Sequence, residues 1–160
     1  MNTATSPTID HATIWNAFLR MRNALASEIG RELSRETGLS EADFDVLSVL
    51  AEHPQESVRA MALRCGLDWE KSRLSHQLKR MEQRGLVARE VCVEDNRGSM
   101  IAITPLGRER VTVARELYAR ILQERVFGVL TAEQIRQFGE ITGAIADGFP
   151  TMHQERAETA

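Results

Sequence analysis

Several features that mark well-known protein classes are scarce or absent in this sequence. Its two cysteines, Cys65 and Cys92, are too few for a disulfide scaffold and do not match the spacing of a zinc site. No apolar run approaches the roughly 18–20 residues that cross a bilayer, and the N-terminus lacks the apolar segment of a secretory signal. We therefore expect a cytoplasmic protein with reduced thiols and no membrane partner.

Motifs of catalysis are absent as well. The sequence contains no glycine-rich phosphate loop and no nucleophile elbow. The histidines at positions 11, 53, 76 and 153 are scattered, and no two of them are three or four residues apart, as a metal site on a helix would require. These absences argue against an enzyme, and we expect no cofactor and no metal site.

The charge of the chain is unevenly distributed. The formal net charge of −3 alone would argue against binding to nucleic acid. Residues 1–56 carry 4 basic and 9 acidic side chains, residues 57–108 carry 10 and 6, and residues 109–160 carry 6 and 8. The basic excess thus lies entirely in the middle third of the chain, and the local field governs the attraction of phosphate groups.

Helical periodicity marks both ends of the chain. Apolar residues three and four positions apart predict an amphipathic helix over residues 10–36, which Gly38 closes. In the C-terminal third, a threonine followed by Pro105 is typical of a helix start, and Thr131 with Gln134 has the pattern of a capping box. We expect helices over residues 105–150.

The residues between these helices predict a helix-turn-helix followed by a β-hairpin. Ser40 and Ser57 are placed to cap two helices, and Gly66 is placed to permit a sharp turn. Asp68 can cap the next helix, and Gly85 can end it. Valines before the polar tip at residues 94–99 and isoleucines after it then predict the two strands of a wing.

The predicted fold is therefore mainly α with a small β wing, an α+β winged helix-turn-helix over residues 40–104. The flanking helices, residues 10–36 and 105–150, carry more apolar surface than the small winged module can cover. We expect them to be dimerisation helices that pack against a second copy, with residues 1–9 and 151–160 as flexible tails. A homodimer also matches a pseudo-palindromic site on double-stranded DNA.

The last helix of the helix-turn-helix concentrates basic and hydrogen-bonding side chains. A helix of this kind fits the major groove of DNA, where an arginine can bond guanine with two hydrogen bonds and serine or histidine can contact base edges or phosphates. The alternative interpretation is a solvated basic helix face. The candidate DNA-binding residues on this helix are Lys71, Ser72, Arg73, Ser75, His76 and Lys79.

The wing tip offers a second basic element. Arg97 is placed to enter the minor groove, where a narrow cleft concentrates negative potential. The alternative is that residues 95–98 form a turn that only shapes the hairpin.

Four sequence motifs, taken together, resemble the MarR family of transcriptional regulators. The segment KSRLSHQLKRMEQRGLVAR at residues 71–89 is similar to the family's recognition helix and its RLE-x-x-GLV-x-R signature. DNRG at residues 95–98 resembles the wing motif D-x-R-G, and ITPLGR at residues 103–108 resembles LT-x-x-GR. DFDVL at residues 43–47 resembles a D-[FY]-x-VL helix. The resemblance spans residues 10–150.

The resemblance implies a triangular homodimer whose termini interleave, and a repressor that a small aromatic or anionic effector releases from its promoter. It further implies that Asp95 holds an arginine of the DNA-binding surface by a charge-assisted bond. Trp15, Phe18 and Arg22 lie near the position of the family's effector cleft, where rings could stack on a ligand and the arginine could pair with its carboxylate. Apolar residues at this spacing also suit a dimer core.

We therefore expect a homodimeric, sequence-specific DNA-binding transcriptional regulator that a small molecule controls. Two alternatives remain open. One is a redox-responsive regulator of the same fold, in which Cys65 or Cys92 is oxidised. The other is a winged-helix module that docks a protein instead of DNA.

Overall fold

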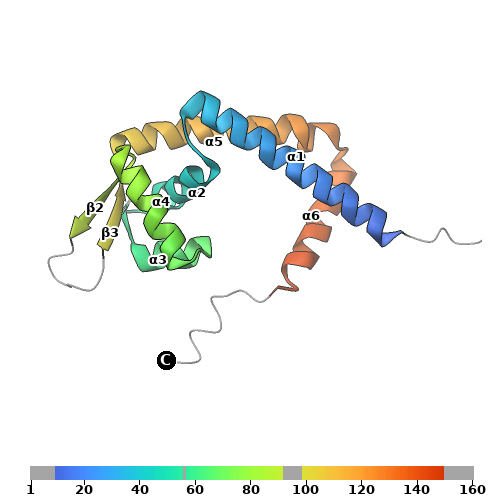
Figure 1. Ribbon diagram of the computed structural model, residues 1–160. Helices are drawn as coiled ribbons and strands as arrows, with labels where there is room; N and C mark the ends of the chain where they lie inside the picture. Colours follow the sequence, from blue (N-terminus) through green and yellow to red (C-terminus); the bar gives the residue numbers. More distant parts are fainter. Residues whose placement is uncertain (1–9, 56, 92–98, 150–160) are drawn as a thin grey trace, which may run out of the picture.

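Residues 10–55, 57–91 and 99–149 are described by the computed structural model, and they form a mainly helical protein with one small sheet (Figure 1). The helices are α1 (His11–Thr37), α2 (Glu41–Glu52), α3 (Ala60–Leu67), α4 (Lys71–Gln83), α5 (Pro105–Arg125), the short 3-10 helix η1 (Phe127–Val129) and α6 (Ala132–Ala146). The strands are β1 (Ser57–Arg59), β2 (Val87–Val91) and β3 (Ser99–Ile103). The predicted fold class is confirmed, whereas the tails predicted at 1–9 and 151–160 lie outside the described residues.

Local capping signals fix most of the helix ends. Gly38 closes α1 in the left-handed conformation (φ 66°), which costs glycine little because it has no Cβ. Ser40 and Asp43 form a complete capping box at the start of α2. Thr131 does the same with Gln134 at the start of α6. These ends were predicted from the sequence, and the structure confirms them.

The start of α3 and the turn between α3 and α4 differ from the prediction. Gly66 lies inside α3, and Asp68 adopts the positive φ (52°) that ends this helix. Aspartate is among the few residues other than glycine that tolerate this conformation. Asp68 therefore does not cap α4, and Glu70 takes that position without a side-chain hydrogen bond. Ser57, predicted to cap α3, lies in β1 instead, because strand pairing with β3 uses its backbone.

The sheet is antiparallel, with β3 between β1 and β2. β2 and β3 are the predicted wing strands, and their hairpin tip lies outside the described residues. β1 was not predicted. It pairs Val58 with Ile101, and this buries Val58 beside the hairpin. The three strands anchor the wing to the helical part of the fold.

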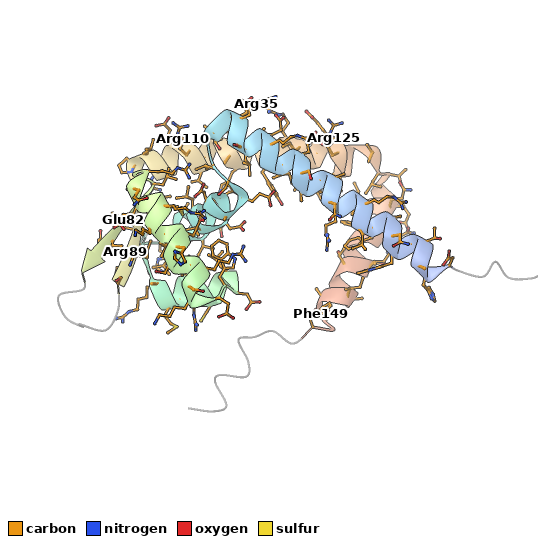
Figure 2. The ribbon with its side chains drawn as sticks, in the orientation of Figure 1. Arg35, Glu82, Arg89, Arg110, Arg125 and Phe149 are labelled. Atoms are coloured by element: carbon orange, nitrogen blue, oxygen red, sulfur yellow. The ribbon has the colours of Figure 1, made fainter. Side chains whose placement is uncertain are left out.

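One hydrophobic core joins the winged part of the fold, residues 40–104, to α1 and α5. Every main element except α6 and η1 contributes to it, and the fully buried side chains include Leu33, Leu47, Leu63, Met81, Ile101 and Val111. α5 lies along α1, with Arg110 donating to the carbonyl of Thr37 (2.9 Å) and Arg125 paired with Glu28 (2.8 Å) (Figure 2). The winged part hangs from one end of this pair, and α6 and the start of α1 project at the other end (Figure 1).

Candidate nucleic-acid interface

The sequence of α4 gives it one buried side and one open side. Leu74, Leu78 and Met81 recur at three- and four-residue spacing and are buried in the core. The helix ends in a Schellman motif, in which Gly85 (φ 71°) is left-handed and the amide of Leu86 donates to the carbonyl of Met81 (2.9 Å). α4 is therefore held rigidly, with its remaining surface turned to solvent.

All six residues predicted to contact DNA from this helix are exposed on it. Helical geometry puts Ser72, His76 and Lys79 opposite the buried stripe. Lys71 and Ser75 lie on the flank toward α3 and the strands, and Arg73 lies on the flank toward α2. Asp95 and Arg97, predicted at the wing tip, lie outside the described residues.

The side chain of Arg73 is held in place by an aromatic ring. Its guanidinium carbon lies 4.1 Å from the ring centroid of Trp69, which is buried just before α4. Asp45 of α2 also acts on Arg73. Neighbouring groups desolvate the Asp45 carboxyl group and raise its pKa, although the residue is exposed overall, and the positive charge of Arg73 opposes this rise.

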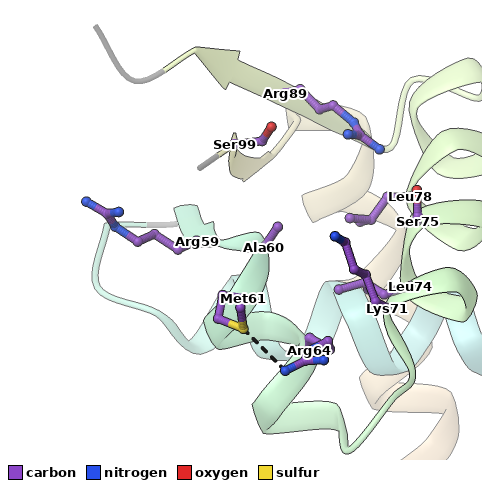
Figure 3. Close-up of a pocket in the computed structure, with 10 residues that line it drawn as sticks. All are labelled: Arg59, Ala60, Met61, Arg64, Lys71, Leu74, Ser75, Leu78, Arg89 and Ser99. Carbon is purple, nitrogen blue, oxygen red and sulfur yellow. Dashed lines mark hydrogen bonds between the residues drawn. The ribbon is translucent and has the colours of Figure 1, made fainter. Parts of the chain in front are cut away.

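Beside α4 lies a hollow with basic side chains at its edge, which was not predicted from the sequence. Arg59, Arg64 and Arg89 surround it together with Lys71, over a floor that includes Leu74 (Figure 3). Its volume is about 350 Å³. These arginines belong to the basic middle third of the chain, so the uneven charge distribution indicated the segment but not the hollow. Only the folded arrangement, in which α3 packs on β3 and α4 packs on β2, brings them together.

These cations are anchored to different extents. Arg89 is paired with Glu82 at 3.4 Å, and Arg64 lies 3.3 Å from the sulfur of Met61. Lys71 points into the hollow from the start of α4 (Figure 3). They lie beside the open side of α4, which carries His76 and Lys79, so basic side chains gather on this part of the fold. Such a surface suits a polyanion more than an apolar partner.

A second hollow lies between α1, α2 and α5. Phe18 and Arg22, two of the predicted effector residues, line it together with Phe44 and Tyr118, and its volume is about 280 Å³. Trp15, the third predicted effector residue, stacks on Phe18 at 5.2 Å and is not part of the lining. Phe44 and Tyr118, which stack on each other at 5.3 Å, were not predicted as lining residues.

The comparisons with known proteins agree with this geometry. The model of the MarR family matches residues 37–98. The structure of Sco3205, a MarR family transcriptional regulator from Streptomyces coelicolor in complex with DNA, is 29% identical in sequence and superposes with a TM-score of 0.80. The match covers 92% of each chain. In both sequence and fold, this chain is similar to MarR family transcriptional regulators.

Two further relatives show the same similarity. AbsC, a MarR family transcriptional regulator from Streptomyces coelicolor, is 26% identical with a TM-score of 0.78, over 89% of this chain and 97% of AbsC. YdgJ, an uncharacterized HTH-type transcriptional regulator of Bacillus subtilis, is 26% identical over 106 residues, which are 66% of this chain and 63% of YdgJ. The aligned segment thus spans less than two thirds of this curated relative.

The resemblance predicted from the sequence is confirmed by these matches, and so is the winged helix-turn-helix fold. The family consists of transcriptional regulators, which agrees with the prediction that the chain is not an enzyme. In the ranges that the structure describes, no helix has both the length and the apolarity to cross a bilayer.

Proposed function

We propose that this protein is a homodimeric, sequence-specific DNA-binding regulator of the MarR family that represses transcription until a small effector releases it. The single observation that carries the proposal is the open basic side of α4, on a fold that superposes on a relative crystallised with DNA. In this proposal the winged part, residues 40–104, binds DNA. The flanking helices, residues 10–36 and 105–150, form the dimer.

The six exposed residues of α4 divide into roles by their position. Ser72, His76 and Lys79, opposite the core, face the floor of the major groove. Arg73 is restrained by Trp69 and therefore loses less side-chain freedom on binding, which suits a base contact. Lys71 and the cations around the hollow beside α4 face the phosphates. From the wing motif alone, Arg97 enters the minor groove in this proposal, and Asp95 holds an arginine of the DNA-binding surface by a charge-assisted bond.

The dimer is supported by apolar side chains that the single chain leaves open. Ile14 and Trp15 on α1, with Ile141 and Ile145 on α6, are exposed, and α6 buries no residue of its own. Clusters of exposed large apolar side chains are typical of protein interaction surfaces. A two-fold partner would cover both helices and place two copies of α4 about one turn of DNA apart.

The effector site of the proposal is the hollow between α1, α2 and α5. Phe18, Phe44 and Tyr118 give it aromatic walls, and Arg22 supplies a cation that donates to Asn23 at 3.1 Å. An aromatic ring fits these walls, and Arg22 can pair with a carboxylate on the ring, in a hollow that Glu41 and Asp45 also line. Because the hollow lies between the dimer helices and the winged part, a ligand there can favour one relative orientation over another.

The experiment is a selection of duplexes from a random-sequence library with the purified protein. We expect a pseudo-palindromic site whose affinity exceeds that for unrelated DNA by at least about 10³-fold. Equal binding of all sequences, or none, would contradict the proposal. Addition of simple aromatic carboxylates to the complex then tests release.

The wing has its own test within this experiment. Arg97→Ala should weaken binding to the selected site and lower the slope of log affinity against log salt by about one unit. The measurement is a salt titration of the wild type and the variant side by side. An unchanged slope and affinity would remove Arg97 from the interface.

A further inference from the structure

A buried polar cluster lies where α4 meets the corner between α1 and α2, in the same hollow that Arg73 lines. At its centre is Asp43, whose side chain is 1% exposed. Its carboxylate accepts hydrogen bonds from the amide of Ser40 (2.8 Å), from Gln77 Nε2 (2.6 Å) and from Arg84 Nη1 (2.7 Å). Gln77, a residue type usually found at the surface, is only 3% exposed here.

The cluster ties three helices together. Gln77 belongs to α4, and its side-chain oxygen accepts a hydrogen bond from Arg80 on the next turn, so its amide is fixed at both ends. Arg84 ends α4 and reaches the carbonyl of Gly38, the residue that closes α1, with its second nitrogen. Asp43, on the first turn of α2, is the acceptor that these donors share.

A buried polar cluster of this kind restricts the geometry of the helices in a way that apolar packing does not. Burying a carboxylate is costly, and well-packed apolar side chains of similar volume often give equal or greater stability. Hydrogen bonds, however, weaken steeply as their angles depart from linearity, whereas apolar contacts tolerate repacking. A set of bonds that converges on Asp43 from two elements therefore restricts the orientation of α4 more than the core alone does.

We propose that Asp43, Gln77 and Arg84 are positioning residues that set the orientation of α4 relative to α1, and with it the spacing of half-sites that the dimer accepts. This inference rests on the proposed function. α1 carries exposed dimer surface and α4 carries the DNA-facing side chains, so the angle between them determines the separation of the two copies of α4. Two-fold regulators match that separation to the distance between half-sites.

The test uses the duplex that the wild-type protein selects, together with derivatives that have one base pair added or removed between the halves. The wild type should prefer the native spacing by about tenfold or more. Gln77→Leu and Arg84→Met should reduce this preference to within about threefold, while their affinity for unrelated DNA stays unchanged. Arg84 is 44% exposed, so its replacement leaves the core intact and folding is retained even if Gln77→Leu unfolds.

Exchanging the carboxylate and the amide between positions 43 and 77 distinguishes a positioning role from a simple loss of packing. Asp43→Asn alone places an amide group against donors and should lose the spacing preference. Asp43→Asn combined with Gln77→Glu restores one carboxylate and one amide, now in reversed positions, and should recover it. As a control, Ile101→Val changes a fully buried side chain of β3 outside the cluster and should keep the native preference.

The outcomes distinguish this inference from the proposed function. A wild type that selects no DNA overturns both. A wild type with a clear spacing preference that Arg84→Met and Gln77→Leu both retain overturns the positioning role alone. Loss in these variants, with recovery in the exchanged pair, establishes it.

Discussion

Replacing Ile141 by glutamine tests whether the apolar side of α6 is a dimer contact. Ile141 lies in the interior of α6, and its side chain is 58% exposed in the single chain. Glutamine has a helix propensity at least as high as isoleucine, so α6 itself should be retained. Full burial of an isoleucine contributes about 1.5–3 kcal/mol, so burial of the exposed part contributes about 1–1.5 kcal/mol in each protomer.

A two-fold dimer contains this substitution twice. The expected loss is therefore about 2–3 kcal/mol of association free energy, which raises the dimer Kd by about 30- to 150-fold. Sedimentation equilibrium over a range of protein concentrations measures this change. Met61→Gln is the matched control, because Met61 is 63% exposed but lies on α3 in the winged part. If the Kd of Ile141→Gln stayed within about threefold of the wild type, α6 would not be part of the interface.

Three further predictions concern stability and specificity. A Cβ at Gly107 would lie 2.1 Å from the carbonyl oxygen of Leu86, so Gly107→Ala should lower the unfolding free energy by about 2–4 kcal/mol, whereas Gly66→Ala, with open space around it, should raise it by about 0.5–1 kcal/mol. Chemical denaturation of both variants checks the opposite signs. Burial raises the pKa of Asp45, so its carboxylate lowers stability as the pH rises through the ordinary aspartate range. Asp45→Asn should therefore raise the Tm at neutral pH, with a gain that fades below about pH 4, and a constant gain across pH would contradict this cause. Arg73→Ala should reduce discrimination between the selected site and random DNA by about 1–3 kcal/mol in competition assays, whereas an equal loss on both would make Arg73 a phosphate contact.

Signals that act over a few residues were readable from the sequence. The Ser40 cap, the left-handed Gly38 and the threonine cap at Thr104 each involve neighbours within four positions, and all were found where predicted. The apolar stripe of α4 was equally clear. Periodicity therefore identified the helix that carries the candidate DNA contacts.

Features that depend on distant partners were not readable. β1 is three residues long and exists because it pairs with β3, more than 40 positions along the chain. Gln77 looks like a surface residue by type, and only the approach of Asp43 from α2 explains its burial. Likewise, Asp68 is a residue type that often starts helices, but it takes the left-handed conformation that ends α3.

α5 has a mechanical consequence for a protein of this shape. It is one uninterrupted helix of 21 residues, about 31 Å long, that starts at the base of the wing, where Thr104 bonds the carbonyl of Leu86, and ends beside α1. If its C-terminal end is the pivot, a tilt of about 6° displaces the other end by about 3.4 Å, the rise of one base pair. Because α5 is packed on α1 and α2 along its length, such a tilt would have to carry the winged part with it as one body.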